Sequence, residues 1–221
     1  IRTDYHDGIS RYTTELGNAL AQLTPVTFVI SDPKQLTFLP RGARHVKIHS
    51  VTSILEPFTA RILNKYQPDL VFSPMQTMGS GGRQFKLILT CHDMIFFRHR
   101  TPPRTIPTII RIGWWLYHTT YAFNRASLNG ADMVATVSHT VKHELEQTKM
   151  TKRPIIVTPN APQRLDQFVQ SIKQTKIRNI VYMGTFMPYK NVETLIKGMK
   201  WLPDHTLHLL SRIAPERQAE L

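Results

Sequence analysis

The chain has 221 residues, of which 41% are hydrophobic, and this share is typical of a folded globular protein rather than a disordered one. Its 28 Lys and Arg residues outnumber 15 Asp and Glu residues, and the resulting formal charge of +13 favours an anionic membrane surface, a phosphate-bearing substrate or nucleic acid as partner. The single cysteine, Cys91, excludes an internal disulfide and a multi-cysteine zinc site, and it favours a reducing compartment.

Short apolar runs alternate with helical patterns along most of the chain. Strands are predicted at Val26–Ser31, His45–His49, Asp69–Ser73, Lys86–Cys91, Asp132–Val137 and Ile155–Thr158. Helices are predicted at Ser10–Leu23, Ser53–Tyr66, Thr108–Leu128 and Thr140–Lys149. This alternation is typical of βαβ units, so we predict an α/β fold with a parallel sheet.

A polar stretch, Asn160–Lys176, interrupts this alternation, which then restarts. Strands are predicted at Asn179–Met183 and Thr206–Leu210, and helices at Asn191–Trp201 and Pro215–Leu221. We predict a Rossmann-like domain over 1–162, a linker over 163–176, and the beginning of a second Rossmann-like domain over 177–221, because two strands do not make a stable sheet. No strand is visible before Asp4, where a doubly wound domain usually has one, so we expect further residues at both ends.

No targeting or membrane-spanning segment is apparent. The first ten residues contain no apolar stretch that would indicate a signal peptide. The most apolar long segment, Ile106–Phe123, contains Arg111 and His118, which argues against a transmembrane helix. We therefore expect a cytoplasmic protein that is peripheral at the inner face of the membrane.

The first candidate site is the stretch Asp7–Tyr12, in which Gly8 and Ser10 lead into a helical run. Backbone N–H groups at such a helix start, with Arg11 close by, suit a phosphate or a carboxylate. The alternative is a plain helix start, with Ser10 as N-cap and the tyrosine packed in the core.

The second candidate site is His92 and Asp93, directly after the predicted strand that ends at Cys91. Ligands of open parallel sheets bind beyond the carboxyl ends of the strands, where a His–Asp pair can position a hydroxyl or handle a proton. The alternative is a strand-end histidine with a capping aspartate. Cys91 points to the other face of the strand, so we expect a buried structural thiol.

The stretch from Phe96 to Arg125 combines five arginines and several aromatic residues with no acidic residue. A basic helix with tryptophan near its middle can lie in a membrane interface, and Arg104, Arg111, Trp114 and Trp115 are the candidate membrane contacts. The alternative is a core helix whose aromatic residues pack on the sheet. The stretch could also stack on single-stranded nucleic acid, but no RNA- or DNA-binding signature supports nucleic acid as a partner.

Two further stretches carry polar side chains in suggestive spacing. His139 and His143 are four apart on a predicted helix, but without an HExxH motif or a clear third ligand we expect a solvated face and no metal site. Later, a strand ends at Gly184, and Thr185, Lys190 and Asn191 follow before a helix. Glycine allows close approach, Lys190 offers a point charge for a phosphate, and Asn191 can cap the helix. The alternative is an ordinary βα turn with a surface lysine.

Taken in order, these stretches resemble one family. The matching pieces are GISRY, DLVFSP, the HD pair after a strand, ADMVATVSHTVKHEL, IIVTPNAP, and VYMGTFMPYKN followed by VETLIKGM. The chain resembles, over nearly its whole length, a retaining glycosyltransferase of the GT-B fold, family 4, in particular its mannosyltransferase-like members.

The resemblance implies roles for the candidate residues. In such enzymes the N-terminal domain mostly holds the acceptor, the C-terminal domain holds a nucleotide sugar, and chemistry occurs in the cleft between them. It implies that His92 and Asp93 contact the donor sugar and shape its pocket. The other implied roles are donor binding by Gly8, Gly184, Thr185, Lys190 and Asn191, and cleft or acceptor contact by Ser10, Arg11 and Ser138.

The chain also departs from the family pattern. Thr185 and Tyr189 stand where the family often has basic residues, which leaves fewer charges for a diphosphate. The family's E-x7-E glutamate pair is not found among the downstream glutamates, Glu193, Glu216 and Glu220, so we expect this chain alone to be inactive.

The resemblance implies a hexosyltransferase that moves mannose or glucose from a nucleoside diphosphate sugar to a lipid-linked or glycan acceptor at a membrane surface. No metal or other cofactor is expected, in agreement with the lack of a DxD triplet. The alternatives are a basic α/β binding module without catalysis and a degenerate transferase that serves as a regulatory subunit.

Overall fold

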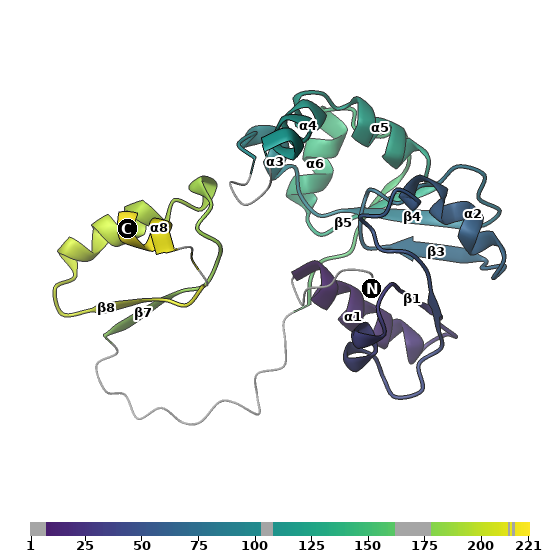
Figure 1. The fold of residues 1–221 in the computed structure, drawn as a ribbon, viewed down its shortest axis with the longest axis horizontal. Helices are drawn as coiled ribbons and strands as arrows, with labels where there is room; N and C mark the ends of the chain where they lie inside the picture. The colour runs from purple at the N-terminus through teal and green to yellow at the C-terminus, as the bar shows by residue number, and fades with distance from the viewer. Residues whose placement is uncertain (1–7, 103–107, 162–177, 212, 214) are drawn as a thin grey trace. The chain divides into compact units, whose positions relative to one another are not determined.

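The computed structural model describes residues 8–102, 108–161, 178–211, 213 and 215–221. The chain divides into two compact units, one formed by residues 1–100 and 112–161 and the other by 101–111 and 162–221 (Figure 1). The predicted linker, 163–176, lies outside the described residues, as does Arg104.

The first unit alternates helices with short strands. Its elements are α1 (Gly8–Ala21), β1 (Phe28–Ile30), η1 (Pro33–Phe38), β2 (His45–Lys47), η2 (Glu56–Phe58), α2 (Thr59–Asn64), β3 (Leu70–Ser73), β4 (Lys86–Cys91), α3 (Ile95–Arg98), most of α4 (Thr108–Thr119), α5 (Ala122–Asn129), β5 (Met133–Thr136), α6 (His139–Gln147) and β6 (Ile155–Val157). Strands β3, β4, β5 and β6 form a parallel sheet in this order, and β1 pairs with β2 in a separate parallel sheet. The predicted α/β class with parallel strands is confirmed.

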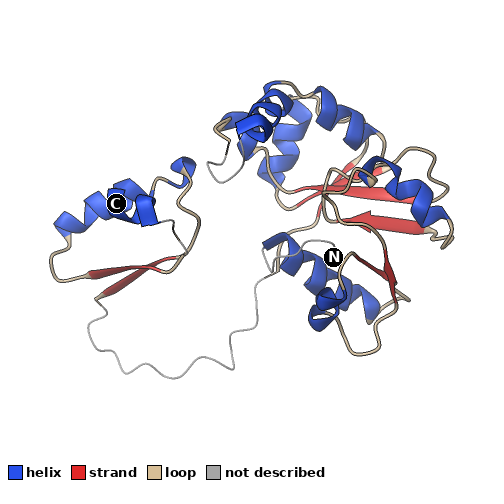
Figure 2. Cartoon of the chain, in the orientation of Figure 1, coloured by secondary structure: helices blue, strands red, loops and turns tan. Residues whose placement is uncertain are grey.

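Strand β4 is the centre of the larger sheet, between β3 and β5. Its side chains alternate between the two faces, and Leu87 and Leu89 are fully buried with Val134 of β5. Leu128 of α5 and Leu145 of α6 pack into the same core, and these helices lie beside the sheet in Figure 2. Such burial explains why the β4 sequence reads as an almost continuous apolar run.

The predicted helix over 108–128 is two helices, which corrects the prediction. Helix α4 ends at Thr119, and α5 begins at Ala122. The Thr120 hydroxyl accepts a hydrogen bond from the Ala122 N–H at 3.2 Å, and the Thr119 hydroxyl donates to the Leu116 carbonyl at 2.7 Å. These side chains compete with the helical backbone ladder, so the chain turns without glycine or proline.

A cavity of about 710 Å³ lies between the two sheets of the first unit. Phe28 of β1, residues 70–73 of β3, and Leu16 and Gly17 of α1 contribute to its walls. A Cβ atom on Gly17 would lie 2.6 Å from the Phe28 ring, so glycine here lets α1 lie close to β1. Phe28, Ile30 and Leu39 form a smaller core, whereas Val29 of β1 and Ile48, directly after β2, pack with the larger one.

The second unit has one pair of parallel strands and short helices. Its elements are β7 (Asn179–Tyr182), η4 (Pro188–Lys190), α7 (Val192–Gly198), η5 (Met199–Trp201), β8 (Thr206–Leu209) and α8 (Pro215–Glu220). Val192 is buried, and Arg217 of α8 forms an ion pair with Glu193 of α7, which joins the two helices.

Candidate functional site

His92 follows β4 directly, at the carboxyl edge of the larger sheet. Its Nε2 lies 2.8 Å from the carbonyl oxygen of Pro74, which follows β3. Because a carbonyl oxygen only accepts hydrogen bonds, Nε2 carries the proton. In the neutral ring, Nδ1 is then the hydrogen-bond acceptor, which is the role that a ligand hydroxyl needs.

Tyr12 of α1 fixes the His92 ring from a second side. The two rings meet edge to face, with centroids 5.0 Å apart and an interplanar angle of 87°. The Tyr12 hydroxyl lies 3.0 Å from the Thr158 hydroxyl, directly after β6. Two chain segments, at Pro74 and at Tyr12, therefore contact the imidazole, and Thr158 holds Tyr12 in turn. The imidazole lies beyond the carboxyl end of β4, where ligands of parallel sheets bind.

The neighbours of His92 have structural partners. The Asp93 carboxylate accepts the Ile95 N–H at 3.0 Å, so Asp93 orders the start of α3. Cys91 is buried, and burial, helped by the Asp93 and Glu144 carboxylates, raises the pKa of its thiol to about 12. A thiol that stays protonated is a poor nucleophile. The expected burial of this thiol is confirmed.

The remaining first-unit candidates lie on helix ends. Gly8 begins α1, and a Cβ atom at this position would meet no described atom within 4 Å, so packing does not require glycine there. Ser10 is buried in the first turn of the helix, whereas Arg11 is exposed. Ser138 is the N-cap of α6, where its hydroxyl accepts the Val141 N–H at 3.2 Å. Within the described residues, Arg11 and Ser138 form no hydrogen bond to the Tyr12–His92–Thr158 cluster.

The loop after β7 holds the second-unit candidates. The Gly184 N–H donates to the Ser211 hydroxyl at 2.9 Å, and the Thr185 carbonyl accepts the Tyr182 hydroxyl at 2.8 Å. Lys190 is exposed, with Nζ 5.3 Å from the centre of the Tyr189 ring. Its ammonium group is therefore available to an anion from solvent.

Asn191 adopts the left-handed conformation, with φ of 52°, which asparagine tolerates better than most residues. It occupies the N-cap position of α7, but its side chain accepts the Thr194 hydroxyl at 2.8 Å and makes no side-chain cap to a backbone N–H. The expected capping bond is thus replaced by a bond between side chains.

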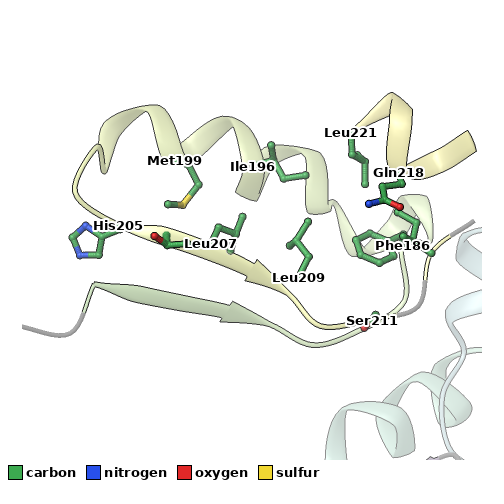
Figure 3. Close-up of a pocket in the computed structure, with 11 residues that line it drawn as sticks. Phe186, Ile196, Met199, His205, Leu207, Leu209, Ser211, Gln218 and Leu221 are labelled. Atoms are coloured by element: carbon green, nitrogen blue, oxygen red, sulfur yellow. The ribbon is translucent and has the colours of Figure 1, made fainter. Parts of the chain in front are cut away.

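The hollow of the second unit is a separate feature. It has a volume of about 540 Å³, and Figure 3 shows Ile196, Met199, Leu207 and Leu209 pointing into the space between α7 and β8. Gly184, Thr185, Lys190 and Asn191 do not line it. Most of its lining is apolar, although His205, Thr206, Ser211 and Gln218 also contribute, and no Lys or Arg lines it.

The predicted membrane contacts on α4 separate into two faces. Trp114 packs inward. Its ring centroid lies 4.0 Å from that of His118 and 5.2 Å from that of Phe96. Trp115 is 48% exposed, and Arg111 is half-buried. Burial lowers the pKa of His118, whose Nδ1–H donates to the Trp114 carbonyl at 2.8 Å.

His139 and His143 of α6 are both exposed. In the described part of the chain, no three His, Cys, Asp or Glu side chains are grouped as metal ligands would be. No helix in the same residues has the length and apolar character needed to cross a membrane.

The parallel strands and intervening helices of the first unit form a Rossmann-like α/β domain. Residues 6–161 match the model of Glycosyltransferase Family 4. The match covers more than half of the chain, so this protein belongs to glycosyltransferase family 4, and the predicted family is confirmed at this level. No curated protein matches the chain.

Three residues of the cluster were not predicted as site residues: Tyr12, Pro74 and Thr158. Each has a weak signal in the sequence, since Tyr12 ends the GISRY stretch and the other two come at or directly after the ends of predicted strands. Parallel strands bring such positions to a common edge, and this rule would have selected Pro74 and Thr158.

Proposed function

We propose that this protein is a retaining hexosyltransferase that moves mannose or glucose from a nucleoside diphosphate sugar to a lipid-linked or glycan acceptor at a membrane surface. Family membership supports glycosyl transfer in general. The observation that carries the proposal is the fixed imidazole of His92, which lies at the carboxyl edge of a family 4 domain with its proton held on Nε2.

His92 would bind the transferred sugar. With Nε2–H bound to Pro74, the ring offers Nδ1 to a sugar hydroxyl, and the edge contact with Tyr12 restricts its rotation. A preorganised acceptor costs little reorganisation when the sugar becomes oxocarbenium-like in the transition state. Asp93 would keep the loop in place through its bond to the Ile95 N–H.

Lys190 would bind the diphosphate of the donor. An exposed ammonium group is a compact point charge, which stabilises negative charge as it grows on the leaving diphosphate. Because Thr185 and Tyr189 add no charge in the same loop, Lys190 carries this role alone among the four predicted loop residues. The proposal uses no metal, so chelation with EDTA should leave donor binding unchanged.

The first test measures donor binding by saturation-transfer NMR, with UDP-glucose and GDP-mannose as the donors. We expect Lys190→Gln to weaken binding of the nucleotide sugar. Lys200→Gln is the matched control, because Lys200 is also exposed, with Nζ 4.8 Å from the neighbouring Trp201 ring. Equal binding by both variants would remove Lys190 from the site.

The second test concerns the sugar. His92→Ala should abolish saturation transfer to the sugar protons while the protein still folds, with a lower melting temperature because the Pro74 bond and the Tyr12 contact are lost. His143→Ala, at an exposed position of α6, should change neither. Loss of folding together with binding would mark His92 as structural.

Turnover is tested by incubating the donor with a polyprenyl phosphate acceptor and following the anomeric proton of the product. An α-linked product from an α-linked donor would support retention, and inversion would contradict it. Donor binding with no transfer to any acceptor would agree with the inactivity expected without the E-x7-E pair. It would also agree with a regulatory subunit, the alternative for which the uncharged Thr185 and Tyr189 argue.

A further inference from the structure

Four large apolar side chains of α4 and α5 in the first unit are exposed to solvent. Positions 112 and 116 are four apart and share one side of α4, with 115 next to them. The Phe123 ring of α5 stacks on Tyr117 of α4, with 5.6 Å between the ring centroids, which places it beside the same helix. We call this surface the α4–α5 face: Ile112 (56% exposed), Trp115 (48%), Leu116 (53%) and Phe123 (60%).

The opposite side of α4 already supplies the contacts that hold the helix. Trp114 and His118 pack with Phe96 of α3, and His118 also lies 5.4 Å from the buried Phe97 ring. The α4–α5 face is therefore not needed for this packing. Contiguous exposed apolar side chains of this kind mark an interaction surface.

The sequence segment that carries the face is basic. No Asp or Glu occurs between Met94 and Ala131. Arg98 is paired with Glu144 at 2.6 Å, but Arg125 and Arg100 donate to the backbone carbonyls of Thr148 and Phe97, which leaves their charges uncompensated in these bonds.

We propose that the α4–α5 face inserts into the interfacial layer of an anionic lipid bilayer. Tryptophan favours the headgroup region, aliphatic side chains enter the acyl boundary, and arginines are attracted to anionic headgroups. Two copies of this face would bring like charges together, which disfavours a dimer. Isoleucine and leucine offer no ring for base stacking, which disfavours nucleic acid. The inference rests on the proposed function in one respect: it identifies the part of the protein that would contact the membrane surface proposed there.

The test is sedimentation of the whole chain with vesicles, at low salt and without any nucleotide sugar. Vesicles of phosphatidylglycerol and phosphatidylcholine in equal parts should retain the protein, phosphatidylcholine vesicles should retain much less, and Trp fluorescence should shift to the blue. Ile112→Asp with Leu116→Asp should weaken vesicle binding at least about tenfold, because the loss of one buried aliphatic side chain already lowers the affinity by about this factor.

Two matched controls separate the face from general properties of the protein. Leu23→Asp with Ile54→Asp changes two exposed apolar residues elsewhere, 83% and 91% exposed, and should bind vesicles like the unchanged protein. Arg100→Gln should weaken binding to anionic vesicles about fivefold, whereas Lys34→Gln on η1 should not. Thermal melts of all variants confirm that they fold.

Three results would overturn the inference: no retention on anionic vesicles, equal retention on neutral ones, or unchanged retention of the Ile112→Asp, Leu116→Asp variant. Self-association that disappears in this variant would also overturn it, because the face would then bind a second copy. Vesicle binding and donor binding are measured separately, so failure of the transferase proposal is distinguishable from failure of this one.

Discussion

The side-chain oxygens of Tyr12 and Thr158 lie 3.0 Å apart, although 146 positions separate the two residues in the chain. This bond joins α1 to the loop after β6 and closes the group of side chains around His92. The same tyrosine ring touches the imidazole, so one residue links the packing of the fold to the candidate site.

Removing the Tyr12 hydroxyl separates these two contributions. Tyr12→Phe should lower the free energy of unfolding by about 1 kcal/mol, the usual net value of a partly buried hydrogen bond, while keeping the ring against His92. Tyr12→Ala should cost more, because the ring contact is lost as well. Urea unfolding measures both. Thr158→Val should cost at least as much as Tyr12→Phe, because the Thr158 hydroxyl also donates to the Thr136 carbonyl at 3.4 Å. A Tyr12→Phe protein as unstable as Tyr12→Ala would contradict this account.

The protonated nitrogen of His92 can be observed directly. We expect nitrogen NMR to show the Nε2–H form when the ring is neutral, because the Pro74 carbonyl can only accept. Exposed His143, as an internal control, should show the averaged pattern of a solvated ring. An Nδ1–H form at His92 would refute the geometry on which sugar binding is argued.

Asp132 should make folding sensitive to acid. Its carboxylate accepts the Leu87 N–H at 2.8 Å and pairs with Arg83 at 2.8 Å, and these contacts lower its pKa from the ordinary 3.8. The unfolded chain therefore binds the proton first as the pH falls. The stabilisation is complete above 3.8 and is lost as the pH drops through the lower folded-state pKa.

Asp132→Asn keeps an acceptor for the Leu87 N–H but removes the charge. We expect it to cost roughly 1 kcal/mol or less near neutral pH, since the side chain is partly exposed. The difference from the unchanged protein should shrink in acid, as thermal unfolding at several pH values would show. A difference that stays constant down to the acid limit would mean that the charge plays no part.

His118 should add a second pH dependence at higher pH. Burial lowers its pKa below the ordinary 6.5, so the unfolded chain is protonated before the folded one. The stability that depends on neutral His118 is complete above 6.5 and is lost as the pH falls through the folded-state pKa. His118→Phe keeps an aromatic ring next to Trp114 and Phe97. It should remove this part of the change of melting temperature with pH, as thermal melts at several pH values would show. An unchanged slope would assign it to other histidines.

Particular residues show what could be predicted from the sequence. Strand β4 has the predicted bounds, Lys86–Cys91, because its apolar run is buried on both sides, and this placed His92 at the correct edge. The end of α4 was not predictable in the same way, because it depends on the hydroxyls of Thr119 and Thr120 rather than on a glycine or proline.

The partners of His92 were out of reach for a different reason. Strand alternation determines which way His92 points relative to Cys91, but it does not say which side chain of another segment meets the ring. The Tyr12 contact depends on how α1 packs across the sheet. Likewise, helical periodicity gives the spacing of Trp114 and Trp115, whereas only the position of Phe96 and Phe97 decides which of them faces inward.

The cavity between the two sheets also bears on how the first unit opens. The layer of β1, β2 and η1 has a small core of Phe28, Ile30 and Leu39, and its Val29 and Ile48 pack with the large core that β4 and β5 share. Two cores that are only partly joined can lose structure at different free energies. Native-state hydrogen exchange should therefore resolve two cooperative units. The amides of β1 and β2 should exchange through a partial opening, whereas those of β4 and β5 should exchange only on complete unfolding.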